Sequence, residues 1–396
     1  MKVNLLFRLI IFLFITTPLV SVSAAPADGF KKETSTGKAA AEKLTQITGI
    51  AISPLAGIGG VGAFRYWKAK PENRPGLSWY AQPWFFVPAL LLVAACMAKD
   101  SAGPFVPTSL KKPLDLLELF ENKISGIIAT GAVVPMALEI FEALKPTGGP
   151  STMTLSSVGF AALDFSWLGD LVMVPLALLI YATVWLFSHT IHVLILVSPF
   201  TTVDTALKGF RAFILGSLVV LPAIDERAGV LWSVVIVLVS VVFAPWAFRT
   251  VVFGSVFAWD IASRQKHRFS PKKDCVWAFS ARRLGKVPHR SLGRVSRNGE
   301  GELVFIWRSW LIFAPQTETL TQGHYIIGQG LIHSEILRVE EESTFDIFNL
   351  PPRCNGHEQA VAGALGLTEI HPIGLRAFWA ALSGLIGGRN RVRSAL

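Results

Sequence analysis

The stretch GVLWSVVIVLVSVVFAPWAF, residues 229–248, decides the fold class because its twenty residues include no charge. A hydrocarbon layer about 30 Å thick is crossed by about 20 apolar residues of α-helix. Shortly afterwards RQKHRFSPKK, residues 264–273, contains five basic residues and no acid. The sequence therefore predicts an α-helical multi-pass membrane domain over residues 44–261, followed by a small water-exposed domain.

Composition supports this division. The 396 residues are 52% apolar and only 16% charged, with a mean hydropathy of +0.49, whereas soluble domains are about 25% charged. The three cysteines, Cys96, Cys275 and Cys354, are too far apart for a disulfide framework or a set of metal ligands. We predict no metal, no cofactor and no catalytic residue.

The amino terminus has the features of an export signal. Lys2 and Arg8 accompany an apolar run over 5–20, and small residues precede a cleavage point at Ala24. Residues 1–24 are therefore predicted to be a signal peptide or an uncleaved signal anchor. Residues 25–43 would then form a polar arm outside the cytoplasm.

Five apolar stretches are predicted to span the bilayer, and two shorter pieces are predicted to form a re-entrant hairpin or a broken helix. Basic loops favour the cytoplasm, and this rule places both the loop after Phe64 and the stretch 264–297 there. The expected location is the inner membrane of a bacterium. The five spans are Leu44–Phe64, Pro75–Ala98, Ile124–Leu138, one that includes Leu171–Phe187, and Gly229–Phe248; the shorter pieces are Val193–Val203 and Ala212–Ile224.

Two Ser-Pro pairs suggest an internal repeat. Ser53-Pro54 precedes Arg65 by eleven residues counted from the proline, and Ser198-Pro199 precedes Arg211 by twelve. Paired broken helices in two halves of a chain are typical of transporters, where freed backbone groups bind a solute or ion. The alternative is that Ser-Pro pairs recur by chance in membrane helices.

Four polar residues within or beside apolar segments are further candidates for binding a solute or ion: Asp164, Asp170, His189 and His192. Ionisable groups in a bilayer are costly and usually face a cavity or a partner. The alternative is that the acids mark helix ends and the histidines lie at the membrane surface. An intramembrane enzyme using the two histidines ranks last, since no nucleophile or ligand set accompanies them.

After a basic linker at 262–275, residues 276–371 have the alternation of a β-rich cytoplasmic domain of the α+β class. Strands are expected at 276–279, 303–307, 310–313, 324–327 and 336–339, with a final helix at 357–367. This order of elements resembles a pleckstrin-homology-like barrel, and the resemblance implies binding of anionic headgroups or of a protein partner. The basic tail at 372–396 is predicted to form an amphipathic interfacial helix.

Five basic residues of the linker are the predicted lipid contacts: Arg264, Lys266, Arg268, Lys272 and Lys273. Such residues are attracted to an anionic leaflet. Since membrane topology already accounts for the positive charge, we do not expect nucleic acid as a partner. The sequence does not indicate an oligomeric state.

Residues 44–261 also resemble a family of uncharacterised bacterial multi-pass membrane proteins, a domain of unknown function, through the acidic-then-Lys-Ile segment Leu117–Ile124. That resemblance implies a membrane location and no activity. Two functional hypotheses follow from the sequence. One is binding or transport of a small solute or ion through broken helices, and the other is a membrane scaffold whose cytoplasmic domain binds lipid or protein.

Overall fold

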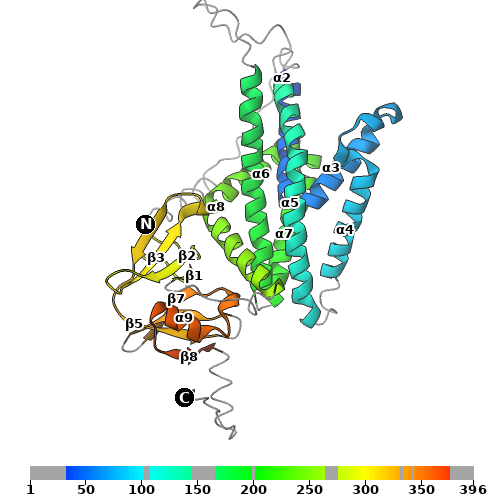
Figure 1. The fold of residues 1–396 in the computed structure, drawn as a ribbon. Helices are drawn as coiled ribbons and strands as arrows, with labels where there is room; N and C mark the ends of the chain where they lie inside the picture. The colour runs from blue at the N-terminus through cyan, green and yellow to red at the C-terminus, as the bar shows by residue number, and fades with distance from the viewer. Residues whose placement is uncertain are drawn as a thin grey trace, which may run out of the picture.

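The computed structural model describes residues 33–101, 108–144, 166–198, 201–263, 275–330, 333–340 and 343–374. These residues form a bundle of long helices and a smaller sheet domain beside one end of it (Figure 1). The predicted signal segment 1–24, the first part of the polar arm, the stretch 264–274 and the tail from residue 375 lie outside the described residues.

Seven helices of the described residues make up the bundle. Within the described residues, three of them are long and apolar enough to cross a membrane, over Val174–Val197, Thr202–Ile224 and Arg227–Ala262. A shorter apolar helix covers Pro83–Lys99. The helices are α2 (Glu33–Ile52), α3 (Pro54–Lys68), α4 (Pro83–Ser101), α5 (Thr108–Leu144), α6 (Ser166–Val197), α7 (Thr201–Ile224) and α8 (Glu226–Ala262).

The predicted single span Leu44–Phe64 is wrong, because the chain turns back at Ser53. Pro54 cannot donate a backbone hydrogen bond and begins α3 instead of continuing α2. Lys43 of α2 and Arg65 of α3 both pair with Glu139 of α5, so the two arms return to the same end of the bundle. We call residues 43–65 the hairpin. Its arms cross closely at Gly57, where a Cβ atom would collide with the Ile50 backbone.

The predicted hairpin or broken helix over residues 193–224 is also wrong. Val193–Val197 is the last part of α6, and α7 is one helix from Thr201 to Ile224. The apolar pieces looked short because Asp204, Lys208 and Arg211 interrupt α7. Lys208 and Arg211 pair with acids of α5. They therefore lower the local hydropathy without breaking the helix.

The segments that lie at each end of the bundle differ from those expected from the sequence. The side chains of Lys99 and Lys208 meet at Asp115, so the last part of α4 and the first parts of α5 and α7 lie at the same end. The loop after Arg65 lies at the opposite end, and the sheet domain lies at the lower left in Figure 1, away from it. The loop that follows Arg65 and the described part of the second basic segment, residues 275–297, were expected on one face, but they lie at opposite ends because the hairpin does not cross the bundle.

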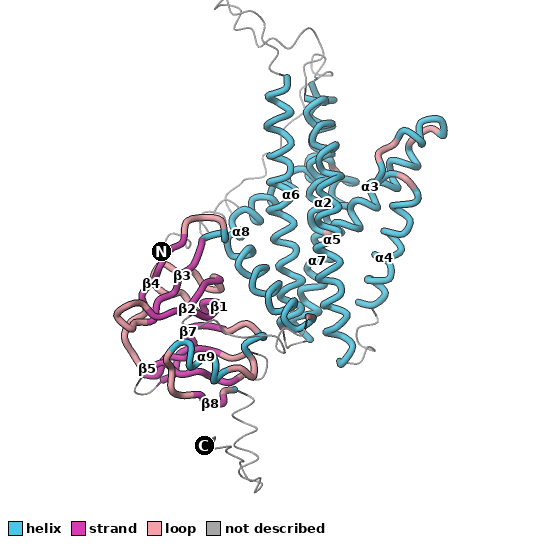
Figure 2. The backbone as a smooth tube through the Cα atoms, viewed as in Figure 1, coloured by secondary structure: helices cyan, strands magenta, loops and turns pink. Residues whose placement is uncertain are grey.

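The sheet domain contains an eight-stranded mixed sheet in the order β4-β3-β2-β1-β7-β6-β5-β8, with β8 parallel to β5. Because β4 and β8 lie at opposite edges, the sheet is open within the described residues and the expected barrel is not seen. Figure 2 shows the strands in magenta. They are β1 (Cys275–Ser280), β2 (Leu292–Arg297), β3 (Leu303–Arg308), β4 (Pro315–Thr319), β5 (His324–Gln329), β6 (Glu335–Glu340), β7 (Ser343–Asn349) and β8 (Ile370–Pro372).

One face of this sheet carries the core of the domain. Val276, Phe305 and Ile327 are buried there, and helix α9 (Glu358–Leu365) covers them with Val361 and Leu365. Four of the five predicted strands and the final helix are confirmed. The exception is 310–313, where Trp310 and Leu311 adopt left-handed backbone angles that a strand does not allow.

The end of α8 packs directly against the sheet domain. Phe253 and Phe257 enclose Phe279 of β1, and Arg353 forms an ion pair of 2.7 Å with the buried Asp260. With 37 residues, α8 is about 55 Å long, which exceeds the thickness of a hydrocarbon layer. The helix can therefore cross a membrane and still position the domain.

Candidate functional site

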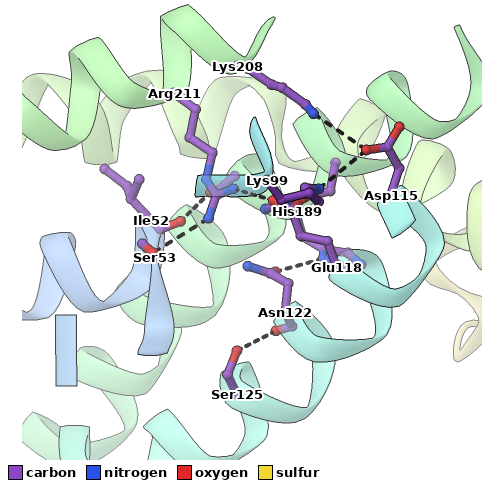
Figure 3. A network of polar contacts seen from close by, with 12 residues as sticks. Ile52, Ser53, Lys99, Asp115, Glu118, Asn122, Ser125, His189, Lys208 and Arg211 are labelled. Carbon is purple, nitrogen blue, oxygen red and sulfur yellow. Dashed lines mark hydrogen bonds and ion pairs between the residues drawn. The ribbon is translucent and has the colours of Figure 1, made fainter. Parts of the chain in front are cut away.

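Polar side chains on one face of α5 form the centre of a buried network (Figure 3). Asp115, Glu118 and Asn122 are spaced three and four residues apart, which places them on one face of a helix. Asp115 and Asn122 are buried, and only 11% of the Glu118 side chain is exposed. Two carboxylates in such surroundings need cationic partners.

Three cations from two other helices supply that charge. Lys99 of α4 lies 2.5 Å from Glu118 and 3.5 Å from Asp115. From α7, Lys208 lies 3.4 Å from Asp115 and Arg211 lies 3.2 Å from Glu118. Residues 208 and 211 are three apart and so share a face of α7. We call these five residues the ionic network.

The tip of the hairpin rests against this network. The Arg211 guanidinium donates to the Ser53 hydroxyl over 3.5 Å, and the Ser188 hydroxyl of α6 donates to the Ile52 carbonyl over 2.7 Å. A helix that ends inside a bundle leaves backbone carbonyls without partners, and side-chain donors can satisfy them. The tip is thus held by polar contacts to α6 and α7.

Two buried histidines of α6 lie beside the network. Nδ1 of His189 is 2.8 Å from the Asn122 side-chain oxygen, and Nδ1 of His192 is 3.6 Å from Glu118. The imidazole centroids are 6.1 Å apart. Nε2 of each ring is buried and has no hydrogen-bond partner among the described residues. Among the described residues, Oδ2 of Asp115 is also buried without a hydrogen-bond partner.

A second charged cluster closes the other end of the hairpin. The Glu139 carboxylate accepts hydrogen bonds of 2.8 and 2.7 Å from Arg65 and pairs with Lys43. Arg65 also donates to the Tyr80 hydroxyl over 2.6 Å. Glu139 is 21 residues beyond Glu118 on α5, a separation of about 31 Å at 1.5 Å per residue. The two clusters are therefore about one hydrocarbon thickness apart.

An apolar cavity of about 780 Å³ lies between the hairpin and α7. Ile50, Val61 and Leu218 are among its walls, and its polar side chains are Thr45 and Gln46. Gly49 and Gly60 also line it, and a Cβ atom added at either would meet nothing within 4 Å. We call this space the hairpin groove. Its volume is in the range of small-molecule sites.

The structure brings together part of the predicted site. Ser53 and Pro54 lie at the buried hairpin tip, and His189 and His192 lie in the same region. Ser198 directly follows α6, which ends at Val197. Asp170 belongs to α6, and nothing is described of its side chain. Pro199, Asp164 and the basic residues 264, 266, 268, 272 and 273 lie outside the described residues.

The sequence interpretation missed the ionic network itself. None of its five residues is among the site residues that the sequence predicts. The available signal was the helical spacing of acids on α5 and of bases on α7. No hydropathy argument could indicate that these two faces meet.

The described residues include no group of three or more His, Cys, Asp or Glu side chains that could hold a metal ion. Comparison with known proteins gives no family for this chain, because no family model, curated protein or solved structure matches it. The resemblance to uncharacterised bacterial membrane proteins remains a prediction.

Proposed function

We propose that this protein is an integral membrane protein that binds a small amphipathic solute in the hairpin groove and moves it past the hairpin tip. The observation that carries the proposal is the hairpin itself. It ends inside the bundle on a network of charged residues, and a cavity of about 780 Å³ lies against its arms. Broken helices beside a cavity are the usual way in which transporters expose backbone groups to a solute.

Three candidate spans and the spacing of the two charged clusters support the membrane location. Charges are stable at the two edges of a hydrocarbon layer and costly within it. Clusters about 31 Å apart on α5 fit a layer about 30 Å thick. The hairpin then enters from the Glu139 side. Each arm has about eleven residues, or about 16 Å of helix, so the tip lies about halfway through the layer, where the Arg211 side chain contacts it.

The sheet domain is proposed to lie in the cytoplasm of a bacterial cell. The chain from Arg264 to Arg297 contains eleven basic residues and one acid, and cytoplasmic segments are enriched in Lys and Arg. The loop with Lys68, Lys70 and Arg74 would then face the other side. Its four basic residues, counted from Arg65, are fewer than the eleven that follow α8.

The groove favours a solute with an apolar body. Most of its walls are aliphatic, and the polar groups Thr45 and Gln46 stand on one arm. The charged residues of the tip lie at one end of the hairpin and can attract a polar group. An inorganic ion alone would gain little from such a lining, because ions need several oxygen or nitrogen ligands. The proposed class is therefore an amphipathic small molecule.

Filling the groove tests this proposal without disturbing the packing. Gly49→Leu and Gly60→Leu place side chains into the open space of the groove. The matched control is Gly216→Leu, at an exposed position of α7 outside the groove, where an added Cβ would also meet nothing within 4 Å. Small molecules extracted from each purified variant are identified by mass spectrometry. Uptake of any co-purified compound into proteoliposomes is then measured.

A compound present in the wild type and the control but lost from the two groove variants, together with its uptake, would support the proposal. If the three preparations contain only the phospholipids of the host membrane in equal proportions, the groove is merely lined by lipid and the proposal fails.

The scaffold function remains the second candidate, because α8 holds the sheet domain through a buried ion pair as well as a linker. Asp260→Asn should loosen that contact and leave the groove intact. If uptake of the solute is unaffected while a cellular phenotype is lost, the scaffold function is favoured over transport.

A further inference from the structure

The segment Ser309–Phe313 is an exposed apolar loop beside the membrane helix. Trp310, Leu311, Ile312 and Phe313 follow one another, with Ile312 79% and Phe313 55% exposed. We call this segment the apolar loop. Runs of exposed apolar residues on a soluble domain usually mark a contact with a protein or a membrane.

The position of the loop identifies its partner. The Trp310 ring lies 4.8 Å from that of Phe248, which is the last residue of the uncharged run 229–248. Thr190 of α6 also donates to the Ala247 carbonyl over 3.3 Å, and it follows His189 in the chain. The end of the run, the ionic network and the apolar loop therefore lie at one level, which is the edge of the proposed hydrocarbon layer.

The backbone of the loop is also unusual. Trp310 and Leu311 have φ values of 53° and 62°, in the left-handed region that bulky side chains rarely adopt. Strained backbone of this kind is retained mainly where function requires a particular side-chain orientation. Here it accompanies an outward-facing Ile312 and Phe313.

Three arginines line a small cleft of about 30 Å³ between this loop and α8. Arg249 donates to the His289 carbonyl over 3.0 Å, Arg290 donates to Thr250 over 3.3 Å, and Arg308 is exposed. None of the three forms an ion pair with a carboxylate in the part of the chain that the structure describes. Like charges gathered without an acid favour an anion, and guanidinium groups suit phosphate.

We propose that the apolar loop inserts into the leaflet next to the sheet domain while Arg249, Arg290 and Arg308 bind the phosphate of an anionic phospholipid. This inference rests on the membrane location and not on the hairpin groove. Aromatic and aliphatic side chains are favourable at the headgroup level, and basic residues add attraction to anionic lipid. The contact would fix the angle between the domain and the membrane.

Insertion is tested with an environment-sensitive dye on Ile312→Cys. Cys96 and Cys275 are half-buried and are replaced by alanine, whereas Cys354 can stay because burial raises the pKa of its thiol to about 12 and so prevents labelling. The matched control is Glu300→Cys, an exposed turn residue at the opposite end of β3. The protein is placed in nanodiscs that contain spin-labelled phosphatidylcholine.

We expect lipid quenching at residue 312 to be several times stronger than at residue 300. Equal quenching at the two positions, or none at either, would overturn the insertion of the loop.

Headgroup binding is tested by native mass spectrometry after release from nanodiscs of phosphatidylcholine and phosphatidylglycerol. The triple variant Arg249→Gln, Arg290→Gln, Arg308→Gln should retain less phosphatidylglycerol, by about fivefold per arginine. The single variant Arg308→Gln changes an exposed residue, so a loss of phosphatidylglycerol in it cannot be attributed to misfolding. Arg283→Gln, which removes an exposed arginine outside the cleft, is the matched control. Unchanged retention would overturn the site. Displacement of the lipid by millimolar inorganic phosphate would show a simple anion site and would also overturn it.

Discussion

The two charged clusters on α5 differ in how the carboxylates of that helix are neutralised. At Glu139, one carboxylate with a 37% exposed side chain lies between Lys43 and Arg65. At the other end, Asp115 and Glu118 share three cations and adjoin two buried histidines. The first cluster holds the base of the hairpin at a surface, whereas the second is sealed by four helices. The comparison indicates that the second is under tighter structural constraint and is the better site for function.

Removing one carboxylate from each cluster should produce the largest difference. Glu118→Gln leaves Lys99 and Arg211 in a buried site with less countercharge, which should cost about 3–5 kcal/mol. Glu139→Gln affects a half-exposed group and should cost about 1 kcal/mol. Thermal unfolding in nanodiscs measures both. Equal losses would contradict the distinction between a sealed and an open cluster.

The hairpin connects the two clusters, so a change where its arms cross should affect both. Gly57→Ala forces a methyl group against the Ile50 backbone and should cost about 1–3 kcal/mol. Gly60→Ala, in the same helix but facing open space, should have little effect. Hydrogen exchange of residues 43–65 reports the outcome, and similar exchange in both variants would argue against a tightly crossed hairpin.

A smaller effect is expected at the base of the hairpin. Tyr80→Phe removes the hydroxyl that accepts from Arg65, while the Arg65–Glu139 pair remains. The expected loss is about 1 kcal/mol, measured by thermal unfolding, with Tyr66→Phe as the control. A loss as large as that of Glu118→Gln would show that the base, and not the tip, is the more constrained end.

The sheet domain provides a buried carboxylate that has hydrogen bonds in place of cations. Burial alone would raise the pKa of Glu358, but donors that include the Gly356 N–H and the Ser334 hydroxyl outweigh it and lower that pKa below 4.5. The ionised form therefore stabilises the fold above pH 4.5, and this contribution is lost as the pH falls through the lowered pKa.

Domain unfolding followed by near-ultraviolet circular dichroism should show an acid-side loss of about 1 kcal/mol or less. The loss should be absent in Glu358→Gln. An identical acid dependence in the variant would assign the effect to other groups.

Much of the fold could be predicted from local patterns. Gly229–Phe248 indicates a span by its length and lack of charge, and the alternation in residues 303–307 indicates a strand. The Ser53-Pro54 pair indicated a break in the first apolar stretch, but it did not show that the chain turns back there, because a hydropathy window averages both residues into their apolar neighbours. The opposite error occurred in α7, where Lys208 and Arg211 lower the hydropathy of a continuous helix. In both cases the length and charge of a segment did not reveal which distant residues it contacts.

The sequence by itself determined that this protein has two parts with different solvents, since apolar helix length and local charge density are properties of the chain alone. It also marked Ser53, His189 and His192 as unusual. Only the tertiary structure decided that the first apolar stretch turns back and that α4, α5 and α7 bring five charges together. It also showed that the loop at 309–313 stands beside the end of the last span. These depend on contacts between residues up to 158 positions apart, such as Ser53 and Arg211, and no local pattern records which distant faces will pack together.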